Sequence, residues 1–146
     1  MAITTNAIAN SFKGQILQAI HNFTASTGNT FKLAMYQTDA TLGASTTSYT
    51  SSQEVSSAGY TAGGKALVNS GVLVTGAVAF TNFANVSFTG VTLTAQGALI
   101  YNDTASGDPA VCVLDFGGPK TATAGTFTVQ FPAFQTDSAI IRIGNA

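Results

Sequence analysis

Charged side chains are scarce in this sequence. Only 8% of its 146 residues are Asp, Glu, Lys or Arg, and five basic against six acidic residues leave a formal net charge of −1. Proteins that bind nucleic acid neutralise phosphates with clustered lysine and arginine, and no such cluster is present here. We therefore expect no nucleic-acid partner, and binding to other molecules should depend on shape and apolar contact rather than on ion pairs.

Cysteine and histidine occur once each, as Cys112 and His21. One cysteine cannot form an intrachain disulfide, and the two residues are too few for a zinc site of the usual kind. Cys112 lies in an apolar run and is expected to be a buried thiol. His21 falls in the last turn of a predicted helix, where a solvated imidazole is more typical than a catalytic base. We expect no metal site and no cofactor.

Long apolar runs and a secretory leader are also missing. No stretch approaches the ~18–20 consecutive apolar residues of a membrane-spanning helix, so no membrane partner is expected. The first eight residues lack the basic and continuous apolar regions of a signal peptide. The sequence therefore predicts synthesis in the cytoplasm without export.

Catalytic motifs are equally hard to find. The six acidic residues are scattered singly, which gives no basis for a carboxylate pair. Asp103 and Asp108 lie near one another in the sequence, but they lack the alternating acids of a calcium loop, and a plain hairpin tip is favoured. The segment 59–65 differs from a phosphate-binding loop at Ala66, where Ser or Thr is required, so a glycine turn with Tyr60 packed across it is expected. We predict no catalytic residue and no enzymatic activity.

The length and the 45% hydrophobic content indicate one domain, residues 1–146, with a single core. Apolar residues spaced three and four apart predict one amphipathic helix over residues 6–24, preceded by an N-terminal arm over residues 1–5. The apolar stripe of this helix consists of Ile8, Phe12, Ile16, Leu17, Ile20 and Phe23.

The rest of the chain, residues 31–146, is predicted to be β. Apolar and polar residues alternate from Phe31 to Tyr36, and short apolar segments separated by turn residues follow. The pattern predicts a mainly β, single-domain antiparallel β-sandwich or barrel of about 7–8 short strands with one N-terminal amphipathic helix. After the strand at 31–36, the expected strands are 66–69, 71–80, 86–94, 98–101, 110–116, 126–131 and 138–143, with hairpin loops at 102–109 and 117–120.

Residues 38–57 lack apolar periodicity and are predicted to form a long loop. Loops of more than ~12–15 residues in a compact domain usually form interfaces or carry function. This loop, the turn after it and the N-terminal arm are therefore the predicted contact regions. The candidate interface residues are Ile3, Thr4, Thr5, Leu42, Tyr49, Val55 and Tyr60.

Five segments carry a resemblance to a known group of proteins. They are Asn10-Ser11-Phe12-Lys13, residues 54–64, Gly97-Ala98-Leu99-Ile100-Tyr101-Asn102, Val113-Leu114-Asp115-Phe116-Gly117 and Ala139-Ile140-Ile141-Arg142-Ile143. In this order they resemble small structural proteins of tailed-bacteriophage virions, over nearly the whole chain. The resemblance implies a virion component rather than an enzyme, and it implies no catalytic residue.

Two positions in the virion follow as hypotheses. The first is a capsid decoration or cement protein that stabilises the head by symmetric protein–protein contacts, with the major capsid protein and a homotrimer as expected partners. The alternative is a neck, tail, baseplate or fibre component that acts as an adaptor or faces a receptor. A carbohydrate-binding module or depolymerase is disfavoured, because the sequence has no tryptophan and no credible acid pair.

Overall fold

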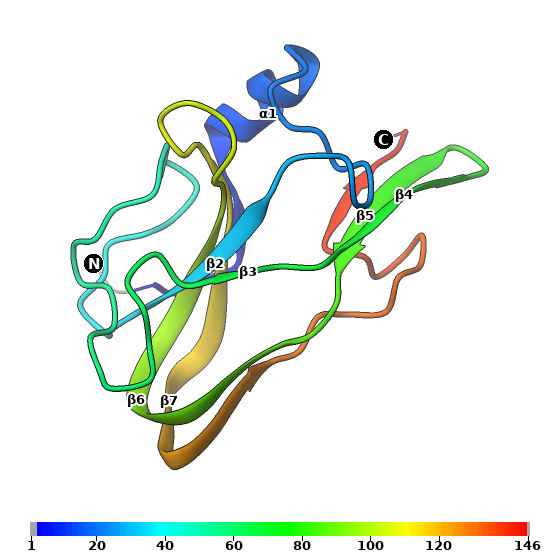
Figure 1. The fold of residues 1–146 in the computed structure, drawn as a ribbon. Coiled ribbons are helices and arrows are strands. Elements are labelled where there is room, and N and C mark those ends of the chain that lie inside the picture. The colour runs from blue at the N-terminus through cyan, green and yellow to red at the C-terminus, as the bar shows by residue number, and fades with distance from the viewer. Residues whose placement is uncertain (1–2, 146) are drawn as a thin grey trace.

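The structure of the protein is a computed structural model that describes residues 3–145. These residues form two antiparallel sheets and one short helix near the N-terminus, which confirms the predicted mainly β, sandwich-like fold class (Figure 1). In chain order the elements are β1 (Ala7–Ile8), α1 (Asn10–Leu17), β2 (Phe31–Tyr36), β3 (Lys65–Ala66), β4 (Asn69–Thr75), β5 (Val78–Phe83), β6 (Val86–Asn102), β7 (Ala110–Val129) and β8 (Ile141–Ile143).

The larger sheet has the strand order β1-β7-β6-β2-β3. Its centre is the hairpin of β6 and β7, which are 17 and 20 residues long and are joined by the loop that the sequence predicts before Pro109. β2 pairs with the second half of β6, from Phe31 opposite Asn102 to Tyr36 opposite Gly97. β1 and β3 are two-residue strands at the two edges of this sheet.

Four of the predicted short strands are in fact two long ones. Segments 86–94 and 98–101 are parts of β6, and segments 110–116 and 126–131 belong largely to β7. Residues 117–120 do not close a hairpin, because 116–119 form a bulge opposite Gln96: Ala95 pairs with Lys120, and Gly97 pairs with Asp115. Gly117 and Gly118 have φ values of 73° and 122°, which allow β7 to continue past the extra residues.

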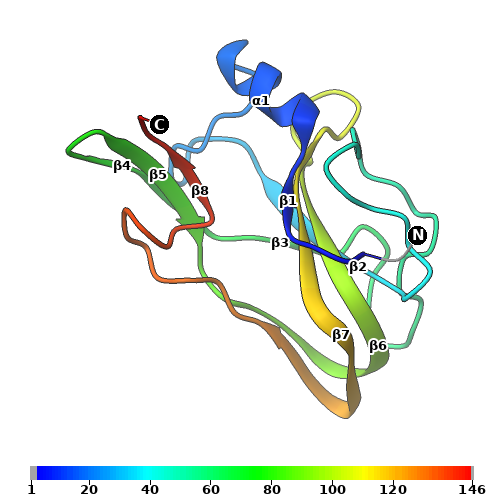
Figure 2. The same ribbon diagram turned by 180° about the vertical axis from the view of Figure 1, so that it is seen from behind.

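The same hairpin bends a second time at its far end. There the pairing is irregular between Phe88 and Leu93, and Gly90 and Ala124 have positive φ values of 62° and 45°. Beyond the bend, the first part of β6 and the last part of β7 run back toward the smaller sheet (Figures 1 and 2).

The smaller sheet has the order β4-β5-β8. The sequence predicts one strand over 71–80, but the chain reverses at Gly76, whose φ is 60°, so that β4 and β5 form a hairpin. A bulge at Gly71 interrupts the start of β4. The β4–β5 hairpin projects from the body of the molecule, with β8 along its inner side (Figure 2).

The helix is shorter than predicted. It covers residues 10–17 instead of 6–24, because residues 7 and 8 pair with Val113 and Cys112 as β1 and because Ala19 takes a positive φ of 59° that ends the helix. Phe12 is its one buried residue, and Leu17 is 88% exposed. The apolar stripe therefore only partly faces the core.

The core lies between the sheets and beneath the helix. Leu33, Leu99 and Val113, from the three central strands of the larger sheet, are completely inaccessible to solvent. Phe23 and Phe31 stack with ring centroids 4.4 Å apart and extend this core toward the smaller sheet. Most of the phenylalanines are buried or half-buried, as alternating strand positions predict.

Candidate interaction surfaces

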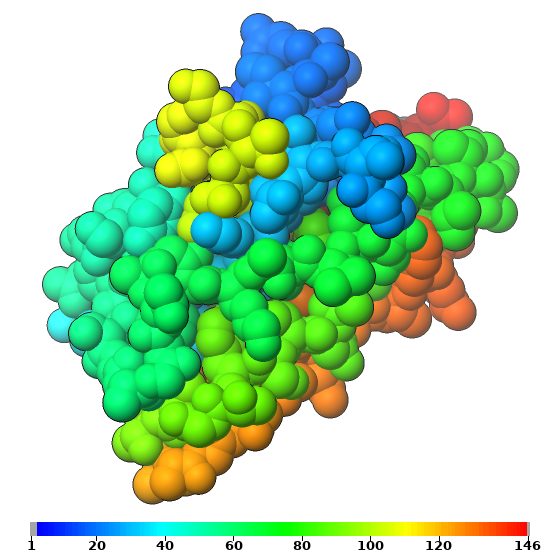
Figure 3. Space-filling model, viewed as in Figure 1, coloured from blue at the N-terminus to red at the C-terminus, as the bar shows by residue number. Residues whose placement is uncertain are grey.

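One buried carboxylate holds the long loop between β2 and β3 against the larger sheet. Glu54 Oε1 accepts hydrogen bonds from the Tyr60 hydroxyl at 2.6 Å and from the Gly63 N–H at 2.8 Å. Glu54 Oε2 accepts a third from the Tyr49 hydroxyl, also at 2.6 Å. The Tyr60 oxygen itself accepts the Met35 N–H of β2 at 2.9 Å. The segment predicted as a loop does form one, packed along one flank of the molecule (Figure 3).

All four tyrosines of the sequence gather around this carboxylate. The Tyr36 hydroxyl donates to the carbonyl of Thr50 at 2.6 Å, and the Tyr101 hydroxyl donates to the carbonyl of Gly63 at 2.7 Å. Burial is the main reason why the pKa of Tyr49 rises to about 12, and it raises the pKa of Tyr36 and Tyr101 as well. These phenols therefore stay protonated at neutral pH and act as hydrogen-bond donors.

No local sequence pattern predicts this Glu54–tyrosine cluster, since its members are spread over residues 36 to 101. The turn that follows the loop is as predicted. Gly59, Gly63 and Gly64 have φ values between 80° and 92°. Tyr60 is buried, with its ring centroid 5.6 Å from that of Phe88. At Gly64 a side chain is impossible without movement, because a Cβ would lie 1.8 Å from the carbonyl oxygen of Leu33.

The predicted interface residues fall into two groups. Ile3, Val55 and Tyr60 are buried within their own chain, at 1%, 5% and 9% exposure, so in this structure they are core residues. Thr4 and Thr5 are exposed, whereas Leu42 and Tyr49 are half-buried and pack against the core. A contact with another subunit stays a prediction for this set.

The predicted N-terminal arm is not free from Ile3 onward. Residues 1 and 2 lie outside the described part of the chain. The side chain of Ile3 packs on Gly97 of β6, which has no side chain to oppose it, and the carbonyl of Ile3 accepts a hydrogen bond from Gln96 Nε2 at 3.2 Å. The N-terminal segment is therefore attached to the larger sheet at Ile3.

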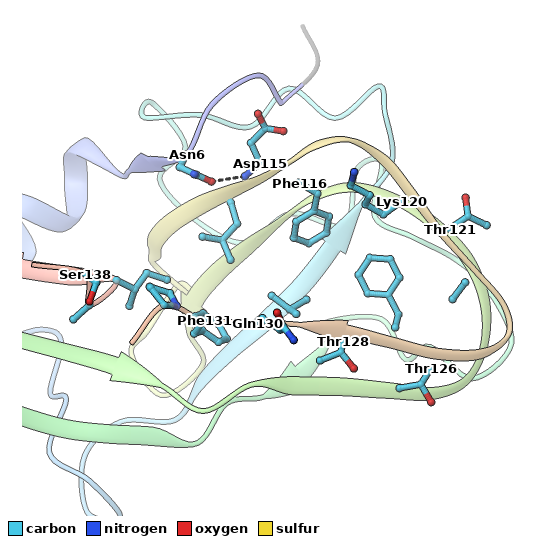
Figure 4. A pocket seen from close by; sticks show the side chains of 17 residues that line it. Asn6, Asp115, Phe116, Lys120, Thr121, Thr126, Thr128, Gln130, Phe131 and Ser138 are labelled. Carbon is cyan, nitrogen blue, oxygen red and sulfur yellow. Dashed lines mark hydrogen bonds between the residues drawn. The ribbon is translucent and has the colours of Figure 1, made fainter. Parts of the chain in front are cut away.

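A groove of about 630 Å³ follows the concave side of β7 (Figure 4). Phe116, Phe127 and Phe131 contribute apolar surface, and Asp115 and Lys120 are the charged residues among its described lining. The Asp115 N–H donates to Asn6 Oδ1 at 2.7 Å and ties the N-terminal segment to one end of the groove. Asp115 is the one acid in this described lining, so the groove does not contain the pair of carboxylates that glycoside hydrolysis requires.

The large apolar side chains that remain exposed gather on and around the smaller sheet. They lie at the end of α1 and shortly after it, on β4 and just before it, and on β8. A second groove, of about 660 Å³, runs between α1 and β8, and we call it the α1–β8 groove. The sequence signal for this surface is the apolar run in β4, which does not alternate with polar residues. The exposed residues are Leu17, Ile20, Val68, Val72, Leu73, Val74 and Ile143.

His21 is buried and lies beyond the helix, contrary to the prediction of a solvated side chain in its last turn. The helix ends at Leu17, before His21. His21 is only 5% exposed, and its ring centroid lies 4.8 Å from that of Phe12. Asn102 Nδ2 lies 3.2 Å from His21 Nδ1, and Gln15 Oε1 lies 3.0 Å from Nε2. Because the amide of Asn102 donates, these contacts select the neutral imidazole with its proton on Nε2. Burial lowers the pKa of His21 and favours the same form.

The remaining candidate groups are structural in this fold. Cys112 is buried, as predicted, and burial raises the pKa of its thiol to about 12. Asp103 Oδ2 lies 3.1 Å from Lys32 Nζ in an ion pair. Within residues 3–145, no three His, Cys, Asp or Glu side chains are grouped as a metal ion would require. No helix in this part of the chain has the length and apolar character needed to cross a membrane.

Comparison with known proteins identifies no relative of this chain. The chain matches no protein-family model, no curated protein and no solved structure.

Proposed function

We propose that this protein is a non-enzymatic structural component of a tailed-phage virion. Its role is that of a capsid decoration or cement protein, which binds the major capsid protein on the outside of the head, self-associates as a trimer and stabilises the particle by symmetric contacts. The resemblance of the five sequence segments to virion structural proteins motivates this proposal.

The observation that carries the proposal is the exposed apolar surface around the smaller sheet. Val74 is 69% exposed and Leu17 is 88% exposed. The exposed residues Leu17, Val72 and Ile143 line two adjoining hollows between α1 and the smaller sheet. Monomeric proteins rarely leave such side chains grouped, and grouped exposure marks surfaces that are covered by another protein. A contact of this kind is what a component of a symmetric shell requires.

The distribution of charge also supports a role based on protein contact. No Asp, Glu, Lys or Arg occurs from Ala66 to Asn102, a range that contains β4, β5 and β6. Contact through these strands would involve no repulsion between like charges, even when identical copies meet. Its free energy would come from apolar burial, at about 25 cal/mol per Å² of area removed from water.

The first test is binding of the purified protein to heads that lack it. Because few charges are present to be screened, we expect the affinity to change little between ~0.1 M and ~1 M salt, where the Debye length falls from ~10 Å to ~3 Å. A steep loss of binding over this range would contradict binding through apolar contact.

The second test is the copy number in purified virions, measured by quantitative mass spectrometry against the major capsid protein. A decoration protein should be present at on the order of hundreds of copies per particle. Roughly six to a few tens of copies would instead support the neck, tail, baseplate or fibre alternative, given the lower symmetry of those parts. Absence from the virion would refute both positions.

A further inference from the structure

The free edge of β8 lies along the α1–β8 groove. β8 pairs with β5 on one side, and no strand in the described part of the chain pairs with its other side. Every residue from 140 to 145 lines the groove. Because side chains alternate between the two faces of a strand, a groove over one face would contact only every second residue. Contact with consecutive residues therefore places the groove along the strand edge, where main-chain N–H and C=O groups are free to pair.

The wall opposite β8 is apolar. It is formed by Phe12, Ile16 and Leu17 of α1. The volume of the groove, about 660 Å³, is within the ~300–1,000 Å³ range of sites that enclose a ligand, and a hollow of about 120 Å³ that shares Ile16 and Ile143 adjoins it. An extended polypeptide in this groove would therefore have main-chain partners on one side and apolar contacts on the other.

The charges that line the groove are of one sign. Lys13 and Arg142 are the charged residues of its described lining, and both are exposed. Lys13 Nζ donates to the neutral side chain of Asn10 at 3.3 Å. The one ion pair among residues 3–145 joins Lys32 to Asp103, so neither cation of the groove is paired within this part of the chain. An uncharged occupant would desolvate these cations without compensation, whereas a carboxylate would pair with them.

We propose that the α1–β8 groove binds an extended segment of a partner protein, which adds to β8 as a further strand of the smaller sheet. The segment places aliphatic side chains against α1 and the carboxylate of an Asp or Glu within reach of Lys13 and Arg142. Main-chain hydrogen bonds and apolar contacts supply most of the affinity, and the carboxylate selects the partner. The proposal deepens the proposed function, on which it rests for the premise that the partner is another virion protein.

The groove fits a segment of another protein better than it fits other occupants. A lipid or another aliphatic acid would match the apolar wall and the cations, but it would leave the main-chain groups of the β8 edge unpaired. A second copy of this chain would have to offer an exposed apolar segment that carries an acid. Its exposed apolar strand is β4, and no Asp or Glu occurs in β4 or anywhere from 66 to 102.

The test selects short peptides on the purified full-length protein. Random octapeptides with blocked ends are enriched on it, and the enriched sequences are synthesised for measurement of Kd by fluorescence polarisation. We expect aliphatic residues at alternate positions together with one Asp or Glu. N-methylation of the peptide main chain should weaken binding by roughly 10-fold or more at every second position only, because alternate N–H groups of an added strand donate to its neighbour.

Two matched pairs of variants locate the binding site. Leu17→Asp places a carboxylate in the groove and should weaken binding by at least about 10-fold, whereas Val68→Asp, the same kind of change at an exposed aliphatic residue outside the groove, should not. Arg142→Gln should weaken binding by roughly 10-fold, and by much less when the acid of the peptide is replaced by its amide. Lys120→Gln, which removes an exposed cation from β7, should bind like the wild type. All four positions are exposed, so urea unfolding should give near-wild-type stability for each variant.

Failure to enrich any peptide, enrichment of peptides without an acid, or equal binding to Leu17→Asp and Val68→Asp would overturn the proposal. Binding that is indifferent to N-methylation would also overturn it, because such peptides do not pair with β8. These measurements use the purified protein alone, so they do not bear on its presence in the virion. Conversely, absence from purified virions would refute the proposed function while the groove could still bind the peptides, and the two failures are thus distinguishable.

Discussion

Replacement of Glu54 tests whether one carboxylate holds the long loop in place. Glu54 is the one buried acid among residues 3–145, and it accepts three hydrogen bonds, from Tyr49, Tyr60 and Gly63. In a Glu54→Ala variant, the hydroxyl of the half-buried Tyr49 can form a hydrogen bond with water instead. The Tyr60 hydroxyl and the Gly63 N–H, however, lose their acceptor inside the protein. An unsatisfied buried donor costs ~1–3 kcal/mol, so we expect a loss of about 2–5 kcal/mol in the free energy of unfolding.

Two further variants separate the hydrogen bonds from the negative charge. Glu54→Gln keeps an acceptor oxygen for Tyr60 and Gly63, and should lose only about 1–2 kcal/mol. Asp39→Ala removes an exposed acid from the same loop and should change stability by less than about 0.5 kcal/mol. Urea unfolding gives all three values, with an unchanged m-value as the check that one transition is being compared. A Glu54→Ala variant as stable as Asp39→Ala would refute the assignment of Glu54 as the attachment point of the loop.

The other predictions concern the helix, the histidine and the cysteine. Phe12→Ala should cost about 3–5 kcal/mol in urea unfolding, whereas Leu17→Ala in the same helix should cost less than about 0.5 kcal/mol; equal costs would mean that Phe12 does not face the core. His21 is held neutral by burial, so the unfolded chain takes up its proton near the ordinary pKa of 6.5 while the folded chain resists. Stability should therefore fall as the pH drops from 7 to 5, by at most about 1.4 kcal/mol per pH unit, and a His21→Gln variant that showed the same slope would contradict this origin. The Cys112 thiol, with its pKa raised to about 12, should react with a thiol reagent at pH 8 only after unfolding, and stoichiometric labelling of the native protein would show that it is accessible.

The fold class could be predicted because its signals are local. Alternation of apolar and polar residues from Phe31 to Tyr36 identifies β2, and the polar residues between Asn102 and Pro109 identify the loop of the central hairpin. Strand lengths could not be predicted. Gly117 and Gly118 are typical of a turn, but the pairing of their neighbours with β6 converts them into a bulge within β7.

The predicted helix was too long for a similar reason. A spacing of three and four residues from Ile8 to Phe23 is compatible with one long helix, and nothing local reveals that Ala7 and Ile8 pair with β7 or that Ala19 takes a positive φ. Tertiary contacts decide both ends. The role of His21 was missed as a consequence, since its position depends on where the helix ends.

How the long loop is held within its own chain could not be predicted from the sequence. The long loop was expected at an interface because of its length, yet Glu54 attaches it to Tyr60 and Gly63 of its own chain. The carbonyl of Gly63 in turn accepts a hydrogen bond from the hydroxyl of Tyr101, 38 positions away. The segment 71–80 was predicted only as a strand, and the exposure of its apolar residues could not be predicted, because burial on either face depends on what the rest of the chain covers. The structure covers neither face of Val72–Val74 fully.

The central claim is that this protein acts through its apolar contacts in a virion. Imaging of intact particles at a resolution that traces this chain tests it most directly. The account predicts many symmetric copies on the outside of the head, with the exposed apolar side chains around the smaller sheet covered by neighbouring subunits. Particles that contain no copy of this chain, or copies whose β4 and α1 surfaces face only solvent, would contradict it.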